Sequence, residues 1–350
     1  MSPATPRVPT VSVIVPCRDE ERYIARCLDS IAATDYPRER LEVLAVDGVS
    51  EDRTRAIVAD YGARYPFIRL LDNPGRIPPT AVNTGIRAAR GEILVRVDAH
   101  GVYPPNYIPA LVAALEQTGA DSVGGVLVTL PANDTAIAQG IAIAMSHPFG
   151  VGNSYFRVGV REPRWVDTIA FFCCRRETFD RVGLFDETLA RDEDSEFNGR
   201  LIQAGGRILL VPHVTAHYYA RDSLWQLARM YHQYGYSKPL VARKLGRVTT
   251  VRQLVPAGFV TALAAATLAL PWVPGAAALL VAAVVPYLVA VAACAIGAGL
   301  RRGGLRTVAA LGLAFPIVHF SYGLGFLQSA LKSLLGSGRP APPVEMPQSR

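Results

Sequence analysis

The strongest constraint on the fold of this chain is the near absence of charge from its final stretch. Residues 253–350 contain 6 basic residues and 1 acidic residue, whereas residues 1–252 contain 30 basic and 28 acidic residues. The two stretches therefore contribute +5 and +2 to the net charge of +7. A region this poor in charge and rich in long apolar runs suits a bilayer better than a water-exposed surface. We therefore predict a globular domain followed by a membrane region.

Three apolar segments of the final stretch are long enough to cross a bilayer, for which about 20 residues suffice. They cover residues 255–272, 273–300 and 308–326. The run from Pro271 to Gly275 predicts a tight turn between the first two segments. The third segment contains Pro316, His319 and Tyr322, so it could instead lie at the membrane interface or pack under the globular domain. Two or three spans are therefore expected.

Basic residues gather just before the first apolar segment. The stretch 238–252 has no acidic residue and carries five basic ones: Lys238, Arg243, Lys244, Arg247 and Arg252. Without it, residues 1–237 have 25 basic and 28 acidic residues, a net charge of −3, which argues against nucleic-acid binding. Arg301, Arg302 and Arg306 follow the second segment, on the same predicted side. The positive-inside rule then places the globular domain in the cytoplasm, on a multi-pass protein of the cell inner membrane.

The predicted organisation has four parts. They are a globular domain over 1–237, a basic amphipathic linker at the membrane surface over 238–252, transmembrane helices over 253–335 and a disordered tail over 336–350. The five cysteines are odd in number and lack a metal-binding spacing, so neither a disulfide framework nor a zinc site is indicated. The first apolar run, Val11 to Val15, is too short for a signal peptide.

Short apolar runs alternate with helical patterns through the globular domain. The predicted strands are 11–15, 41–46, 67–71, 93–97, 122–130 and 207–211, with a further buried strand at 171–174. The predicted helices are 20–33, 52–61, 79–89, 106–117 and 192–204. This alternation is typical of an α/β, Rossmann-like, mostly parallel sheet with helices on both faces.

Acidic side chains follow two of these strands. Asp47 ends the second, and Asp98 and His100 follow the fourth. Ligands of open α/β sheets bind beyond the carboxyl ends of the strands. A carboxylate there can hold a ribose hydroxyl or a divalent ion, and an imidazole suits Mn²⁺ better than Mg²⁺. A turn Asp that caps the next segment is the alternative.

Two further patterns bear on the chemistry. The first strand is followed by Pro16 to Glu21 rather than by a Gly-rich turn, so dehydrogenase and P-loop functions lose their main support. Glu193 and Asp194 begin a predicted helix, where neighbouring carboxylates and partial burial can raise one pKa towards the range useful for a general base. The alternative is that acidic residues simply favour a helix's first turn.

Four motifs taken in order resemble those of glycosyltransferase family 2. They are Val13 to Glu21, Asp47 to Thr54, Arg96 to His100 and Asp192 to Asn198. More narrowly, His147 to Asn153 and the terminal spans resemble the membrane-bound ExoA-like enzymes of succinoglycan biosynthesis. The resemblance covers roughly residues 8–330. It implies a GT-A catalytic domain followed by a C-terminal all-α transmembrane region.

The resemblance assigns roles to individual residues. Asp194 matches the catalytic base, with Glu193 beside it, and Asp98 with His100 matches the DxD element that holds a divalent metal, Mn²⁺ or Mg²⁺. The residues expected to bind the nucleotide-sugar are Pro16, Arg18, Glu20, Asp47, Arg76, Asn83 and Asp98. Arg76 could equally be an ordinary exposed arginine, and Asn83 could equally be a helix-capping asparagine. The chain departs from the family pattern at Asp19, Gly48 and His100.

The implied reaction is the inverting, metal-dependent transfer of a hexosyl group. The donor is a nucleotide-diphosphate sugar, with UDP favoured, and the acceptor a membrane lipid-linked saccharide. Alternatives are direct glycosylation of a polyprenyl phosphate or other lipid, and a non-catalytic sugar-nucleotide-binding membrane protein. Processive synthases carry Gln-x-x-Arg-Trp where this chain has Gln233 to Lys238, so polymerisation is not expected. Gln233, Tyr234 and Lys238 are predicted on the acceptor side.

Overall fold

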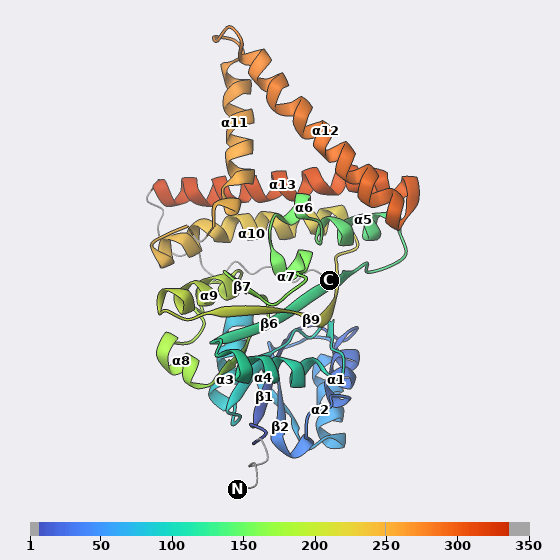
Figure 1. Cartoon of the computed structure of the whole chain (residues 1–350), viewed down its shortest axis with the longest axis vertical. Coiled ribbons are helices and arrows are strands. Elements are labelled where there is room, and N and C mark those ends of the chain that lie inside the picture. The colour runs from blue at the N-terminus through green and yellow to red at the C-terminus, as the bar shows by residue number, and fades with distance from the viewer. Residues whose placement is uncertain (1–6, 249, 336–350) are drawn as a thin grey trace.

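The structure is a computed structural model that describes residues 7–248 and 250–335. A sheet domain, residues 7–220, lies at one end of the molecule (Figure 1). The membrane hairpin, formed by α11 (Val255–Ala269) and α12 (Ala276–Arg302), projects from the other end. Between them lie α10 (Leu224–Leu245) and α13 (Gly304–Leu334). The predicted tail over 336–350 falls outside the described residues.

The sheet domain contains a nine-stranded sheet in the order β3-β2-β1-β4-β8-β6-β9-β5, with β7 paired to β9. Its strands are β1 (Val11–Cys17), β2 (Leu41–Asp47), β3 (Ile68–Asp72), β4 (Ile93–Arg96), β5 (Gly101–Val102), β6 (Ser122–Leu130), β7 (Arg164–Val166), β8 (Cys173–Arg175) and β9 (Ile208–Tyr219). The pairings of β1 with β2 and β4, of β2 with β3 and of β6 with β9 are parallel. The predicted mostly parallel α/β sheet is therefore confirmed.

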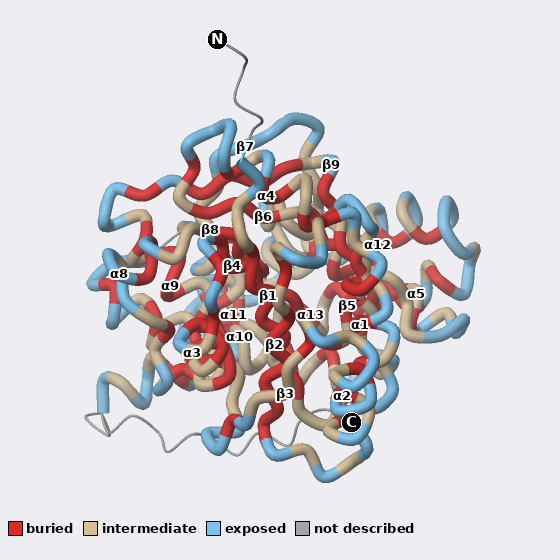
Figure 2. The backbone as a smooth tube through the Cα atoms, turned by 90° about the horizontal axis from the view of Figure 1, so that it is seen from below, coloured by how far each residue is buried: buried red, intermediate tan, exposed pale blue. Residues whose placement is uncertain are grey.

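Helices cover both faces of the sheet because successive strand residues point to opposite faces. Val13 and Val15 of β1 join one core cluster, whereas Ile14 joins the other. The first cluster is covered by α1 (Ile24–Ala32), α2 (Thr54–Arg64) and α4 (Tyr107–Thr118). The second is covered by α3 (Pro78–Ala88), α8 (Glu177–Val182) and α9 (Glu193–Gln203). The buried strands run through the middle of the domain (Figure 2).

The predicted boundary between residues 237 and 238 falls inside a helix. Helix α10 continues unbroken from Leu224 to Leu245, with Pro239 inside it. In the predicted basic linker, three of the five cations pair with the sheet domain. Lys238 pairs with Asp192, Lys244 with Asp186, and Arg252 with Asp167. These carboxylates draw the basic stretch onto the domain.

The membrane hairpin has an apolar exterior. Leu268, Leu279 and Val289 are each at least 62% exposed, and Trp272, near the turn between the helices, is 77% exposed. Such a surface is stable only where lipid or protein covers it. Over the described residues, α11 with the turn before it, α12 and α13 are long and apolar enough to cross a membrane.

Helix α13 lies along α10 rather than alongside the hairpin (Figure 1). Two glycines allow the helices to touch backbone to backbone. A Cβ on Gly235 would lie 2.0 Å from the carbonyl oxygen of Tyr322, and one on Gly325 would lie 2.1 Å from that of His232. The third apolar segment thus packs under the globular domain, which is one of the two alternatives that its Pro316 and His319 left open.

Candidate functional site

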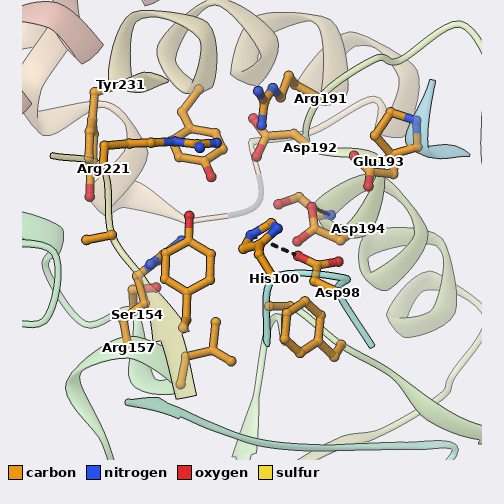
Figure 3. A pocket seen from close by; sticks show the side chains of 18 of the residues that line it. Asp98, His100, Ser154, Arg157, Arg191, Asp192, Glu193, Asp194, Arg221 and Tyr231 are labelled. Atoms are coloured by element: carbon orange, nitrogen blue, oxygen red, sulfur yellow. Dashed lines mark hydrogen bonds and ion pairs between the residues drawn. The ribbon is translucent and has the colours of Figure 1, made fainter. Parts of the chain in front are cut away.

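One large cavity lies beyond the carboxyl ends of the central strands (Figure 3). Its volume is about 1830 Å³, well above the roughly 300–1,000 Å³ of ordinary small-molecule sites. Ten of the residues selected from the sequence line it: Pro16, Arg18, Glu20, Arg76, Asp98, His100, Glu193, Asp194, Tyr234 and Lys238. The strand tips and the start of α9 therefore meet at one site.

The loop after β1 is held in place by the loop after β2. The backbone N–H of Asp19 donates to Ser50 Oγ, that of Glu20 to Thr54 Oγ1, and that of Glu51 to Asp19 Oδ1. Asp19 has a φ of 53°, a left-handed conformation that Asp tolerates better than most residues. This interlock fixes the loop that carries Arg18 and Glu20 against the cavity.

Asp47 lies behind the cavity rather than on its wall. The side chain is fully buried, and its carboxylate accepts hydrogen bonds from the backbone and hydroxyl of Ser50. Arg55 Nη1 lies 2.8 Å from Asp47 Oδ2. Because these partners occupy both oxygens, Asp47 supports the loop after β2, and its expected contact with the nucleotide-sugar does not match this placement.

Asn83 also lies away from the cavity. It is 1% exposed, its Nδ2 donates to the carbonyl oxygen of Phe185 at 2.8 Å, and its Oδ1 accepts from the Phe185 N–H at 2.9 Å. Its amide therefore fastens α3 to the loop after α8, which differs from the expected contact with the nucleotide-sugar. Arg76, in contrast, is exposed on the cavity wall, with a φ of 61°.

Asp98, His100 and Glu20 form the polar floor of the cavity. His100 Nδ1 lies 3.2 Å from Glu20 Oε1, and His100 Nε2 lies 4.0 Å from Asp98 Oδ2. Burial lowers the pKa of His100, but the charges of Glu20 and Asp98 outweigh burial and raise it to about 9. The tip of β4 thus presents an imidazole turned towards two carboxylates.

These atoms fit a divalent metal that is shared with a substrate. Among the described residues no group of three or more His, Cys, Asp or Glu side chains is arranged to hold a metal ion. Asp98 would therefore supply an oxygen and His100, once the metal has displaced its proton, a nitrogen, and diphosphate oxygens would supply the other ligands, as is common for Mg²⁺ and Mn²⁺ sites. Glu20, bonded to the opposite ring nitrogen, would fix the orientation of the imidazole.

Helix α9 brings a second acidic group to the cavity. Asp192, directly before the helix, has a φ of 60° and is held by Lys238 Nζ at 2.9 Å. Burial, followed by the charges of Glu193 and Asp192, raises the pKa of Asp194 to about 7. Asp194 lines the cavity beside Asp98 and His100 (Figure 3). A carboxyl group with this pKa can accept a proton near neutral pH.

Arg96 connects the two acidic groups, and the sequence analysis did not single it out as a site residue. It is 7% exposed, and its guanidinium lies 3.0 Å from Glu193 and 3.6 Å from Asp98. Glu193 thereby faces Arg96 instead of standing free for proton transfer. The sequence did contain a sign of this role, because an arginine inside the apolar run 93–97 is expected to be buried and therefore to need a partner of opposite charge.

Two of the three predicted acceptor-side residues reach the cavity. Tyr234 and Lys238 line it, and Lys238 also donates to Ser195 Oγ at 3.0 Å. Gln233 does not line the cavity, because it lies on a different side of α10 from Tyr234. Lys238 therefore joins α10 to the start of α9 at the edge of the site.

Comparisons with known proteins identify the family of this chain. Residues 12–183 match the model of glycosyl transferase family 2. The chain is 31% identical over 329 residues to succinoglycan biosynthesis protein ExoA of Rhizobium meliloti (strain 1021), covering 91% of this chain and 94% of that protein. It is 27% identical over 243 residues to a dolichyl N-acetyl-α-D-glucosaminyl phosphate 3-β-D-2,3-diacetamido-2,3-dideoxy-β-D-glucuronosyltransferase of Methanococcus voltae, covering 67% and 74%.

A solved structure shares the fold across nearly the whole chain. The mannosyltransferase PcManGT from Pyrobaculum calidifontis, in complex with GDP-Man and Mn²⁺, superposes with a TM-score of 0.60 at 23% identity, covering 95% of this chain and 89% of that one. The likeness supports a GT-A-like fold with a C-terminal helical region. With the motifs gathered around one cavity and a relative that matches nearly end to end, the chain belongs to glycosyltransferase family 2 and is an ExoA-like glycosyltransferase.

Proposed function

We propose that this glycosyltransferase moves a hexosyl group, with inversion, from a nucleotide-diphosphate sugar to a lipid-linked saccharide. The observation that carries the proposal is the large cavity, which is lined by Asp98, His100 and Asp194 and extends to the root of the membrane hairpin. The donor would lie against the loop of Arg18 and Glu20. UDP is the favoured nucleotide. GDP is the first alternative, because the mannosyltransferase of similar fold was solved in complex with GDP-Man.

Asp194 is the proposed base. It would take the proton of the acceptor hydroxyl, whose oxygen attacks the anomeric carbon from the face opposite the diphosphate. Arg96 would keep Asp98 and Glu193 together, so that the donor and the base stay aligned. A divalent metal at Asp98 and His100 would offset the negative charge that develops on the leaving diphosphate.

The membrane hairpin would hold the enzyme where its acceptor is found. The chain has three apolar helices of spanning length, and we place it in the inner membrane with the sheet domain in the cytoplasm. Arg301 and Arg302, at the end of α12 nearer the sheet domain, fit the positive-inside rule for that orientation. An acceptor confined to the same surface is met more often than one free in solution.

A transfer assay tests the proposal. The full chain in lipid nanodiscs is given radiolabelled UDP- and GDP-sugars together with lipid-linked saccharides extracted from the source membranes, with and without Mn²⁺. Label that depends on the extracted saccharide and on the metal supports the proposal. Equal labelling of bare polyprenyl phosphate would favour direct glycosylation of the lipid. Binding of a nucleotide-sugar with no transfer to any acceptor would favour a non-catalytic protein.

A further inference from the structure

The cavity continues from the polar floor to the root of the membrane hairpin. Its wall there is formed by Phe259 of α11, Tyr287 of α12 and Tyr322 of α13. Val255 also lines the cavity and is 63% exposed, so the cavity reaches the outer, apolar surface of α11. A volume of about 1830 Å³ leaves room for a second substrate beside the donor.

Two polar side chains at this end of the cavity, His319 and Tyr287, are hydrogen-bonded within the protein. His319 lies 2.8 Å from the carbonyl oxygen of Phe149 through Nε2 and 3.1 Å from Tyr287 Oη through Nδ1. The neighbouring rings of Phe149 and Phe259 pack against Tyr287. With these hydrogen bonds made, the root of the hairpin presents mainly aromatic and aliphatic surface, which suits a hydrocarbon chain.

Arg157 is a cation in the cavity wall, and its Nη1 lacks a hydrogen-bond acceptor among the described residues. It lies on α7 (Tyr155–Val158) and lines the cavity (Figure 3). Its Nη1 is buried and makes no hydrogen bond within the described part of the chain. Its Cζ lies 5.4 Å from the ring centre of Phe156 and 5.7 Å from that of Tyr218. A buried N–H without an acceptor is costly, so an anion beside Nη1 would stabilise this side chain.

Two other cations of the cavity are already neutralised by the protein. Arg252 lies 2.9 Å from Asp167, and Lys238 lies 2.9 Å from Asp192. These two have structural partners in the protein itself. Arg157 differs from them because aromatic rings, rather than carboxylates, hold its side chain, and rings position a guanidinium without satisfying its N–H donors.

Arg157 stands where the polar floor meets the membrane side. The ring of Tyr218 contacts both Arg157 and His100, whose ring centre is 5.2 Å away. Tyr218 also belongs to the apolar cluster that contains Phe315 and Val318 of α13. A phosphate on Arg157 would therefore lie close to the reacting groups, with the apolar root of the hairpin open to whatever is attached to it.

We propose that Arg157 binds the phosphate of an isoprenoid-phosphate-linked acceptor, whose hydrocarbon chain enters between α11, α12 and α13. That the bound lipid is the acceptor of the reaction rests on the proposed function, whereas the binding of its phosphate to Arg157 does not. The donor's diphosphate carries the same chemistry as this phosphate. The donor is proposed to lie by Glu20 and Arg18, so the two sources can be told apart by which ligand loses affinity when Arg157 is changed.

Ligand binding tests the proposal without any need for turnover. The full chain, in phosphatidylcholine nanodiscs, is titrated with farnesyl diphosphate, with farnesol, and with UDP and GDP. For Arg157→Gln we expect farnesyl diphosphate affinity to fall tenfold or more, while the affinities for farnesol, UDP and GDP stay within twofold. Arg157→Lys, which keeps the charge, should recover part of the loss. Arg161→Gln is the matched control, because Arg161 is exposed four residues further along.

A structural role for Arg157 would give a different result. Since its Nη1 has no partner to lose, Arg157→Gln should leave the unfolding temperature unchanged or higher. A lower unfolding temperature together with equal losses for all ligands would overturn the proposal. So would unchanged farnesyl diphosphate affinity, or a loss for UDP and GDP that matches the loss for farnesyl diphosphate. An inactive wild type that still binds farnesyl diphosphate through Arg157 would refute the proposed function alone.

The path of the chain is tested by photo-crosslinking. A farnesyl diphosphate analogue with a diazirine at the hydrocarbon end should label peptides that contain Phe259, Tyr287 or Tyr322 in the wild type. Labelling should fall with Arg157→Gln and persist with Arg161→Gln. Crosslinks confined to the loop of Arg18 and Glu20 would overturn the proposed entry route.

Discussion

The guanidinium of Arg96 lies 3.0 Å from the carboxylate of Glu193, and so joins the central strand β4 to the start of α9. The same guanidinium lies 3.6 Å from Asp98. One buried cation thus sets the spacing between the tip of β4, where the donor is proposed to bind, and the helix that carries Asp194. The alignment of donor and base depends on this contact inside the domain.

Arg96→Gln should therefore reduce both activity and stability. Breaking a buried ion pair costs about 3–5 kcal/mol, because the remaining carboxylate is left unpaired. We expect at least a hundredfold lower transfer rate and a lower unfolding temperature. Arg175→Gln is the control, because Arg175 and Glu116 form an exposed pair worth about 1 kcal/mol or less. Wild-type activity in Arg96→Gln would show that the contact does not position the site.

The pKa of Asp194 predicts how the rate depends on pH. A base must be deprotonated before it accepts a proton, and burial with the charges of Glu193 and Asp192 raises the pKa of Asp194 to about 7. The transfer rate should thus rise about tenfold per pH unit up to neutrality and level off above pH 8. Rates measured from pH 5.5 to 8.5 with saturating substrates would check this. A flat profile would mean that Asp194 is already ionised or is not the base.

Removal of divalent metal should stop transfer. EDTA is expected to abolish it and Mn²⁺ to restore it, because the Asp98 carboxylate is itself negative and cannot offset the charge of the leaving diphosphate without a metal cation. Asp98→Asn should raise the Mn²⁺ concentration needed for half-maximal rate at least tenfold. Asp222→Asn removes an exposed carboxylate from the same cavity and should not change that concentration. Full activity in EDTA would contradict the assignment.

The contact between α10 and α13 should tolerate no side chain at Gly325. A Cβ there would meet the carbonyl oxygen of His232 at 2.1 Å, and forced overpacking of this kind costs about 1–3 kcal/mol. Gly325→Ala should lower the unfolding temperature by several degrees. Gly312 lies on the same helix with open space around its Cα, so Gly312→Ala should keep or raise that temperature. Equal effects of the two changes would refute the close packing.

The sequence predicted the sheet well because its strands alternate with amphipathic helices. The limits of β6, Ser122–Leu130, match the prediction, and Asp98, His100 and Asp194 meet at one cavity as the motifs indicated. Motif position cannot tell whether a polar side chain points to a ligand or is satisfied by its own loop. Asp47 and Asn83 were therefore expected at the cavity and lie behind it.

Contacts between distant segments were the part that could not be predicted. Arg157 carries no motif, and its place in the cavity wall depends on how α7 packs on the sheet domain. Helix α10 crosses the expected boundary at residue 237 because α13, about 80 residues later, covers it with a glycine-lined backbone contact. The ion pairs of Lys238 and Arg252 likewise depend on tertiary packing, which composition does not show.

The most direct test of the central claim is the transfer rate of Asp194→Asn with its substrates identified. The change keeps size and removes the proton acceptor, so we expect the rate to fall by a factor of about 10²–10⁴ while nucleotide-sugar affinity stays within twofold. Glu187→Gln, a partly exposed carboxylate that does not line the cavity, is the control. A wild-type rate in Asp194→Asn would contradict the account.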